Sequence, residues 1–421
     1  MSILNILSGT INLPFTINTL PNVSLNGVGL AVCKIIEFFS FGGYVAIGIL
    51  IFSLILKIIP LPLDIYSRTA TKKNNLKMEK MRPELEKLQK QYANNKELYS
   101  QKMMALYKKE GYSAFATCLP SILSIVFFIV VITAFNQYSS YCKIDTFNQM
   151  AYAYNESIIY NENVDIYYYE DFDESKIGQL EKIDKTKLNE YEDLSKLKFY
   201  SSLEGNFEDV NSEFYTKIIK NAQDAAARKY IEIEKKYSFL WVQNIWIEDL
   251  PWKKAFIDES NYTNGLFVYS KGCSSTTLEH PLNTVENYKL LTGSSLLDEY
   301  KNKPNGYLIL VVLSIASMLL SQLLISKDQK TQMELQSVDG GNGQAAQTSK
   351  MMMWVMPIMF GIFAFIYTAS FSLYLIISTL FSTASTFIIN KIVENKFKKK
   401  MEQEEQEKFN KRYSHLKRDK K

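Results

Sequence analysis

Long stretches of almost uninterrupted apolar residues alternate along the chain with strongly charged segments. Five of these stretches approach the ~20 helical residues that a bilayer core of ~30 Å requires. They show no period-two alternation, so they favour helices over the strands of a barrel. The predicted spans are 42–63, 118–135, 307–325, 353–368 and 371–389, of which the last two form a tight hairpin. The sequence therefore predicts an all-α polytopic membrane protein.

The segments between the predicted spans differ in charge. Residues 64–117 contain 12 basic and 6 acidic residues, and the tail 390–421 contains the same numbers. Residues 136–305, in contrast, contain 19 basic and 28 acidic residues. Because Lys and Arg accumulate on the cytoplasmic side of membrane proteins, we expect 64–117, the loop 326–352 and the tail in the cytoplasm. The acidic segment and the N-terminus are then expected outside the cell.

The composition excludes two broad classes of function. The chain of 421 residues has a formal net charge of +4, whereas a simple nucleic-acid binder would have a clear basic excess. Two histidines and four cysteines leave little material for a zinc site or a histidine-based catalytic triad. His280 is expected outside and His415 in the tail, so neither has an evident catalytic partner. The sequence predicts a protein that is not an enzyme and has no metal site and no cofactor.

The N-terminal segment 1–41 ends in an amphipathic pattern. One helical face collects most of its apolar side chains: Val28, Leu30, Ala31, Ile35, Phe38 and Phe39. One interpretation is a helix that lies along the outer membrane surface before the first span. An extension of that span is an equally open alternative.

Residues 64–117 have the spacing of a helical hairpin. Apolar residues recur every three or four positions, and Asn94 with Asn95 marks the turn. Glu86 and Lys90 form a favourable i,i+4 pair. The methionines have two interpretations, an adaptable surface for varied apolar segments or packing between the two helices, and packing is favoured. These methionines are Met78, Met81, Met103 and Met104.

The acidic segment 136–305 is too aromatic for a plain linker, so we expect an extracellular insert domain of partly helical fold. A helix is predicted over 206–237, with one apolar side formed by Val210, Phe214, Ile218, Ala222 and Ala225. Three tryptophans belong either to a domain core or to the outer leaflet: Trp241, Trp246 and Trp252.

The predicted location of two cysteines permits a disulfide. Cys142 and Cys273 both lie in the segment expected outside the cell, where disulfides persist. The charged tail 390–421 is either a solvated segment near anionic lipid or a contact to ribosomal RNA. The glycine-containing loop 339–349 lacks a G-K-[ST] sequence, so no phosphate-binding loop is expected there.

Four local patterns occur in a particular order. The first span ends in IPLPL at 59–63, and the second opens with CLP at 118–120. The hairpin contains MRPELEKLQKQY and MMALYKKEG, and the last two spans contain KMMMWVMPIMFGIFAF and SLYLIISTLFS. Together these patterns resemble the YidC family of membrane protein insertases, over about 35–135 and 307–391.

The resemblance implies a bacterial cell-membrane protein with five core helices around a hydrophilic groove. Such proteins insert and help to fold other membrane proteins without hydrolysing nucleotide. The groove is expected to open to cytoplasm and lipid and to be closed outside. The partners implied are nascent membrane proteins, the ribosome through the basic tail, the Sec translocon and the lipid bilayer.

A basic residue in the first span carries the implied mechanism. Most relatives have Arg at this position, and the matching residue here is Lys57. A charge within a span is costly and usually functional, although a lysine this close to the span end can also extend to the interface. The resemblance favours a groove-facing role, in which the amine attracts acidic ends of a client.

Other polar residues of the predicted spans are candidates to line the groove. Gln322 is the strongest, because a glutamine in a membrane needs a partner or water. Small hydroxyls more often serve helix packing. The further candidates are Ser53, Ser124, Thr133, Ser317, Ser321, Tyr374 and Thr379.

Two other classes of function remain as alternatives. A small-solute transporter would also hold a charge in a span, but it predicts internal repeats that the sequence lacks. A membrane-anchored extracellular sensor would use the insert as its ligand domain, but it leaves the cytoplasmic hairpin unexplained.

Overall fold

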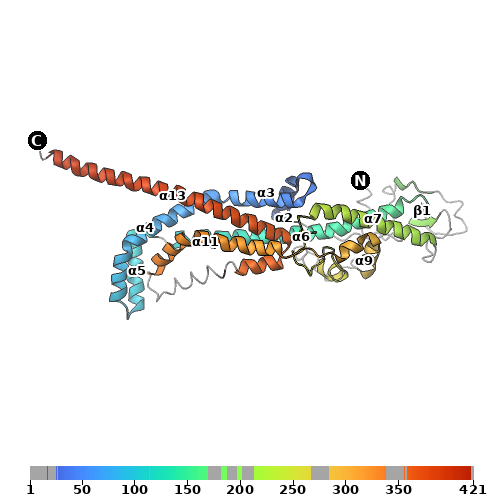
Figure 1. Ribbon diagram of the computed structural model, residues 1–421, viewed down its shortest axis with the longest axis horizontal. Helices are drawn as coiled ribbons and strands as arrows, with labels where there is room; N and C mark the ends of the chain where they lie inside the picture. Colours follow the sequence, from blue (N-terminus) through green and yellow to red (C-terminus); the bar gives the residue numbers. More distant parts are fainter. Residues whose placement is uncertain are drawn as a thin grey trace. The chain divides into compact units, whose positions relative to one another are not determined.

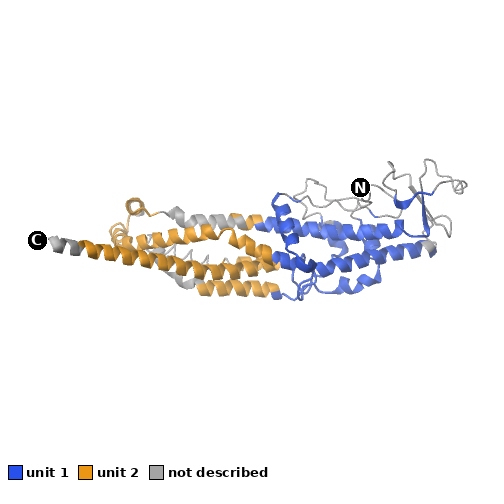
Figure 2. Ribbon diagram, turned by 90° about the horizontal axis from the view of Figure 1, so that it is seen from above, with its two compact units in different colours: residues 1–49, 131–309, 367–371 blue, residues 50–130, 310–366, 372–421 orange. Residues whose placement is uncertain are grey.

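The computed structural model is mostly helical and divides into two compact units (Figures 1 and 2). Unit 1 contains 1–49, 131–309 and 367–371, and unit 2 contains 50–130, 310–366 and 372–421. The structure describes residues 17, 25, 27–112, 114–168, 182–186, 197–201, 213–266, 284–337, 355 and 358–418. Four helices, α3, α6, α11 and α13, contribute residues to both units.

Unit 1 is built around the second half of α6 (Ala114–Ile159) and the helix α7 (Glu213–Tyr237). The remaining elements of the unit are α2 (Gly27–Phe38), η1 (Phe41–Gly43), β1 (Val164–Tyr168), β2 (Leu197–Ser201), η5 (Asn261–Gly265), α9 (Val285–Thr292), η6 (Ser295–Leu297) and α10 (Asp298–Asn302). Strands β1 and β2 pair antiparallel, with Val164 opposite Ser201.

The core of unit 1 explains why α6 continues beyond the apolar window. Residues Ile144, Phe147, Ala151, Tyr154 and Ile158 recur at helical spacing and are all buried. They pack with α7 and with apolar residues from 256–297. Helix α6 therefore does not end at the predicted boundary at residue 136. Its second half carries another apolar face, which packs into the core of unit 1.

The predicted helix over 206–237 is confirmed in its second part as α7. Ile218 and Ala222 are buried as expected, together with Ala226 and Tyr230. Ala225 is half-buried, whereas Val210 and the side chain of Phe214 lie outside the described residues.

The amphipathic pattern near the N-terminus forms a separate helix, α2. Its buried face is Gly29, Val32, Cys33 and Ile36, whereas Val28, Leu30 and Phe38 remain exposed. Helix α2 approaches the start of α3 (Val45–Ile58) very closely at Gly48, where a Cβ atom would lie 2.2 Å from the Ile36 carbonyl oxygen. Only glycine permits this contact. Helix α2 is therefore a separate helix packed against the start of α3, and it does not extend α3 as one continuous helix.

The amide of Asn155 in α6 binds the backbone of Ile17, a residue of the N-terminal segment. Its Nδ2 donates to the carbonyl of Ile17 at 2.8 Å, and its Oδ1 accepts from the Ile17 backbone N–H at 2.8 Å. Asn155 is fully buried and Ile17 belongs to the unit 1 core. The Asn155 side chain thus pairs with both backbone groups of Ile17, as a neighbouring β-strand would.

Replacing Asn155 with alanine is expected to destabilise unit 1 by about 2–3 kcal/mol, because two buried backbone groups lose their partners. Thermal unfolding of the full chain in detergent measures the change. Limited proteolysis should also cut the N-terminal segment sooner. Asn221→Ala, on the exposed face of α7, is the matched control and should change neither readout.

Unit 2 contains most of the apolar helices. They are the rest of α3, followed by α4 (Leu61–Gln91), α5 (Lys96–Glu110), α11 (Ile309–Ser337), a helix over 358–366 and α13 (Ala369–Arg418). Helices α3 and α4 are bent by 42° at their junction. Pro60 and Pro62 explain the break, since proline removes a helical N–H donor but suits the start of a new helix.

The apolar windows map unevenly onto these helices. Within the described residues, Ala369–Lys411 alone is long and apolar enough to cross a membrane, the bent pair α3 and α4 qualifies when taken together, and Ile309–Leu324 is a shorter apolar helix. The turn predicted around Ala369 and Ser370 lies slightly earlier, because α13 already begins at Ala369. Helix α13 then continues without a break through the charged tail to Arg418.

The predicted helical hairpin is confirmed as α4 and α5. Asn95 caps α5 by accepting from the Leu98 N–H at 3.1 Å. Gly111 ends it in the left-handed conformation, with a φ of 60°. The expected Glu86–Lys90 pair is not the one formed, since Glu86 pairs with Arg82 at 3.2 Å.

Candidate functional site

Polar side chains from α11 and α13 meet within the apolar part of unit 2. The Thr383 hydroxyl donates to Ser321 Oγ at 2.7 Å and also contacts the Thr379 carbonyl at 2.8 Å. The next residue on α11 is Gln322, whose Oε1 is buried and has no hydrogen-bond partner among the described residues. An amide oxygen in this state retains full capacity to accept a hydrogen bond from water or from a bound polypeptide.

A second polar contact joins α4 to α13. Arg68 Nη2 donates to the Thr386 hydroxyl at 2.7 Å, and Nη1 donates to Asn390 Oδ1 at 3.3 Å. The buried Nε atom of Arg68 has no partner within the described part of the chain. The sequence analysis did not select Arg68, although an arginine two turns into α4, directly after an apolar run, was the available signal.

Lys57 lies in the last turn of α3, directly before the break at Ile59 and Pro60. Its side chain is half-buried. Ser53 precedes it by four residues, so the two side chains share one face of the helix, and Ser53 is fully buried. The cation therefore stands at the end of a helix next to a polar position, not in the middle of an apolar face.

The other predicted polar residues differ in their surroundings. Ser317 donates to the Ser314 carbonyl within its own helix, which is a packing role. Tyr374 is buried, and Thr379 is half-buried. Thr133 is exposed and belongs to unit 1, so the structure does not bring it together with the others. The Ser124 side chain lies outside the described residues.

The hairpin methionines divide into two groups. Met78 and Met81 are buried with Leu85, Leu106 and Tyr107 between the two helices, and Met103 packs against this cluster. This packing between the two helices agrees with the second interpretation of these three residues. Met104 is 60% exposed and remains the candidate for contact with an apolar segment.

One segment of unit 1, which we call the clamp (residues 238–254), is hydrogen-bonded to the starts of α11 and α13 and to α6. The Ile245 and Ile247 carbonyls accept from the backbone N–H groups of Ser370 and Ala369 at 2.8 and 2.9 Å. The Trp246 carbonyl accepts from the Ser139 hydroxyl at 3.3 Å. The start of α13 and Ser139 of α6, which are far apart in sequence, therefore both hydrogen-bond to backbone carbonyls of the clamp.

Two buried amino acids secure the clamp to the start of α11. Asn305 Oδ1 accepts from the Asn244 N–H at 2.8 Å, while Nδ2 donates to the carbonyls of Asn244 and Glu248. Asp249 Oδ1 accepts from the Tyr307 N–H at 2.8 Å. A Cβ atom on Gly306 would lie 1.8 Å from this carboxylate oxygen, so glycine is required there.

The tryptophans of the clamp have different environments. Trp246 is 1% exposed and contacts Tyr138 and Tyr237 edge to face, so it belongs to a core. Trp252 is 59% exposed, and so is available to the outer leaflet. The two interpretations of the tryptophans thus apply to different residues.

A group of titratable side chains lies where α2, α6 and α7 meet. Burial raises the pKa of the Cys33 thiol to about 12, aided by its hydrogen bond to Glu37 at 3.3 Å. Burial also raises the pKa of Cys142, Tyr138 and Tyr237. All of these groups are therefore neutral at physiological pH.

The predicted disulfide finds no support at its first cysteine. Cys142 is a free, buried thiol, and Cys273 lies outside the described residues. Within the part of the chain that the structure describes, no group of three or more His, Cys, Asp or Glu residues could hold a metal ion.

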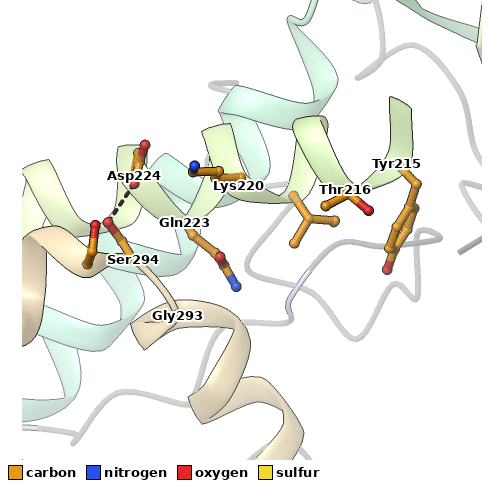
Figure 3. A pocket seen from close by; sticks show the side chains of 9 residues that line it. Tyr215, Thr216, Lys220, Gln223, Asp224, Gly293 and Ser294 are labelled. Atoms are coloured by element: carbon orange, nitrogen blue, oxygen red, sulfur yellow. Dashed lines mark hydrogen bonds between the residues drawn. The ribbon is translucent and has the colours of Figure 1, made fainter. Parts of the chain in front are cut away.

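A cavity of about 440 Å³ in unit 1 lies between α7 and the loop after α9 (Figure 3). Tyr215, Lys220 and Gln223 line it from α7, and Ser294 donates to Asp224 Oδ1 at 2.5 Å at its edge. Its lining combines polar side chains with the apolar Ile219 and the ring of Tyr215.

A family model described as 60Kd inner membrane protein matches residues 37–167 and 225–400. These ranges are well over half of the chain and include the hairpin, the clamp, α11 and most of α13. The chain belongs to the 60Kd inner membrane protein family. Within the acidic segment predicted as an insert, the family model matches 136–167 and 225–305 and leaves 168–224 unmatched. The segment peculiar to this chain is therefore shorter than the sequence analysis expected.

Curated relatives of the family have the name membrane protein insertase YidC. The protein of Clostridium tetani is 34% identical over 90 residues, which are 21% of this chain and 39% of the relative. The protein of Clostridium perfringens is 35% identical over 88 residues, 21% of this chain and 35% of the relative. YidC 1 of Streptococcus agalactiae is 31% identical over 121 residues, 28% of this chain and 43% of the relative. The chain thus spans less than half the length of these relatives, and no solved structure shows a significant match to it.

Proposed function

We propose that this family member is a membrane protein insertase and chaperone. It moves short hydrophilic ends of nascent membrane proteins across the bilayer through a positively charged hydrophilic groove, without nucleotide hydrolysis. The family match and the names of the relatives support the class of function. The groove mechanism rests on the polar residues of unit 2.

The unpartnered Gln322 oxygen beside the Ser321–Thr383 contact is the observation that carries the mechanism. An unsatisfied polar atom costs free energy in an apolar surrounding. Water or the polar backbone of a client satisfies it, so these residues favour a hydrated path between α11 and α13. Such a path shortens the stretch of hydrocarbon that a hydrophilic end must cross.

Lys57 supplies the charge of the proposed groove. A cation in a low-dielectric, partly hydrated site lowers the free energy of an Asp or Glu side chain near it. The apolar helix of the client then moves into lipid, and burial of its ~20 residues drives the step. The energy of insertion therefore comes from the client and not from a cofactor.

The proposed topology places five core helices in the bacterial cell membrane, with the N-terminus and unit 1 outside. The hairpin of α4 and α5, the loop 326–352 and the tail are then cytoplasmic. The exposed Val28, Leu30 and Phe38 of α2 fit a helix that lies on the outer surface of the bilayer.

Two surfaces of the proposed cytoplasmic part, the basic end of α13 and the hairpin residue Met104, are the candidate binding sites for partners. The continuous α13 carries 12 basic residues beyond residue 389, and those side chains that are described are mostly exposed. We propose that it contacts ribosomal RNA or anionic lipid, and that the contact weakens with salt. Met104 on the hairpin is exposed for a client helix, and docking to the Sec translocon belongs to the same proposal.

Reconstitution of the purified chain into liposomes tests the proposed function. A single-span client with a short acidic N-terminal end is added without nucleotide, and protease protection of that end reports insertion. Protection well above that of empty liposomes supports an insertase. Equal protection with and without the protein would exclude it for this client class.

Replacing Gln322 with leucine separates stability from function. Because the amide oxygen is already unpartnered, an apolar residue of similar volume should leave stability unchanged or raise it. Insertion should fall about 3- to 10-fold, since the groove loses a water-binding group. Ser317→Ala is the control, as its hydroxyl is bonded within its own helix. An unchanged insertion rate in Gln322→Leu would remove Gln322 from the groove.

A further inference from the structure

Two large apolar side chains of the clamp lie outside the core of unit 1. Leu240 is 74% exposed and Trp252 is 59% exposed, whereas Trp246 between them is 1% exposed. The packing of unit 1 therefore explains Trp246 but neither of the other two residues.

Leu240 occupies a backbone conformation that leucine rarely adopts. Its φ is 55°, in the left-handed region that Gly, Asn and Asp enter at lower cost. Leu240 and Trp241 are the central residues of a tight turn, in which Phe239 and Val242 exchange two backbone hydrogen bonds of 2.8 and 2.9 Å. Glycine or asparagine would suit this turn better and would expose less apolar surface. Neither the local backbone nor burial in unit 1 therefore explains a leucine here.

The hydrogen bonds of the clamp place it at the same border of three apolar segments. Its partners outside the clamp include Ser139 in α6, Tyr307 before α11 and Ala369 at the start of α13, at 3.3, 2.8 and 2.9 Å. Each of these residues lies within about one helical turn of an end of a predicted apolar span. The spans concerned are 118–135, 307–325 and 371–389.

We propose that the clamp contacts the phospholipid of the outer leaflet, with the side chains of Leu240 and Trp252 in the headgroup layer. This inference rests on the proposed location of unit 1 outside the cell, which makes the border of the three spans the outer membrane–water interface. Tryptophan favours that interface, because its ring is apolar and its N–H is polar. The contact explains why a strained turn presents a leucine and not a glycine.

The residues around Trp252 favour a phospholipid surface over bulk water. Lys253 and Lys254 follow it directly and are exposed, and long lysine side chains can extend to lipid phosphates. The clamp also contains the acidic Glu248 and Asp249, which balance the two lysines in charge. We therefore expect the contact to form on zwitterionic lipid as well as on anionic lipid.

Tryptophan fluorescence of the full chain in zwitterionic phospholipid nanodiscs tests the location of Trp252. In a background with Trp354→Phe, the difference in emission between chains with and without Trp252→Phe reports this one residue. Lipids brominated near the top of their acyl chains should quench the difference emission by about half or more, because the ring lies at the interface. Iodide in the buffer should quench it only weakly. Trp246 stays in every variant and reports that unit 1 remains folded.

Two reporter variants in the background Trp252→Phe with Trp354→Phe extend the test to Leu240. Leu240→Trp should give an emission that the same brominated lipids quench. Tyr160→Trp is the matched control, because Tyr160 is 44% exposed and directly follows the far end of α6. About 30 Å of helix separates it from Tyr138, which contacts Trp246. The control emission should respond to iodide and not to brominated lipid.

The proposal would be overturned if the emission at either site, Trp252 or Leu240→Trp, followed that of the control. Such a result would indicate solvent or a partner protein at this surface. Stronger quenching by bromines near the ends of the acyl chains would also contradict the proposal, since it would place the rings in the hydrocarbon core. These measurements need no client protein, so their failure would leave the proposed insertase function standing. A loss of insertion with normal quenching would concern that function alone.

Discussion

Replacement of Lys57 with alanine is expected to reduce insertion of clients with acidic extracellular ends by about 10-fold or more, whereas Lys57→Arg retains insertion. The loss corresponds to a charge-assisted contact of about 1.5–3 kcal/mol. Arginine keeps the charge at every physiological pH, and from the half-buried position in the last turn of α3 its side chain can extend toward the end of the helix.

Two controls make this result specific to charge. Lys80→Ala removes an exposed cation from the hairpin and should leave insertion unchanged. A client whose acidic residues are replaced by Asn and Gln should be insensitive to Lys57→Ala. Protease protection in liposomes measures each case. Equal insertion of the acidic client by the alanine and arginine variants would show that the amine has no role.

Replacement of Asn305 with alanine should lower the stability of unit 1 by about 3 kcal/mol or more. The fully buried side chain bonds one backbone N–H and two carbonyls of the clamp. Each of these buried groups would lose its partner, at about 1–3 kcal/mol per group. The thermal midpoint of unit 1 should fall by about 5–10 °C, followed by fluorescence of the nearby Trp246.

The neighbouring Asn302 offers a matched control for this experiment. It is exposed, and its amide donates only to the Asp298 carbonyl in its own short helix. Asn302→Ala should shift the midpoint by less than about 2 °C. If both alanine variants unfolded at the same temperature as the parent chain, the clamp would not stabilise the start of α11.

The consequence of a weakened clamp extends to the membrane helices. The clamp bonds the first residues of α13 through Ile245 and Ile247 and the residues before α11 through Asp249. A chain without these bonds loses the backbone hydrogen bonds at the start of α13 and before α11. Under the proposed function, insertion should then fall in parallel with stability, in contrast to Gln322→Leu, where the two separate.

Local sequence information was sufficient for features that depend on neighbouring residues. The 3.6-residue spacing predicted the hairpin and α7, and the long apolar windows predicted the membrane class. Asn95 and Gly111 cap the start and the end of α5. These features follow from backbone propensity and from the free energy of burying apolar side chains, both of which act over a few residues.

Contacts between distant residues required the tertiary structure. Arg68 with Thr386, Thr383 with Ser321, and Asn305 with Glu248 of the clamp join residues that are 318, 62 and 57 positions apart. Composition identifies which residues can form such contacts but not which partner they meet.

The sequence by itself determined that this chain is a helical membrane protein with a cytoplasmic-type hairpin and a family resemblance, because hydrophobic spacing and short motifs are local properties. Only the tertiary structure decided that α6 continues into a second core, that Met78 and Met81 pack inward, and that the amide oxygen of Gln322 has no hydrogen-bond partner within the described part of the chain. These outcomes depend on which faces of distant helices pack together, and packing is a property of the whole fold.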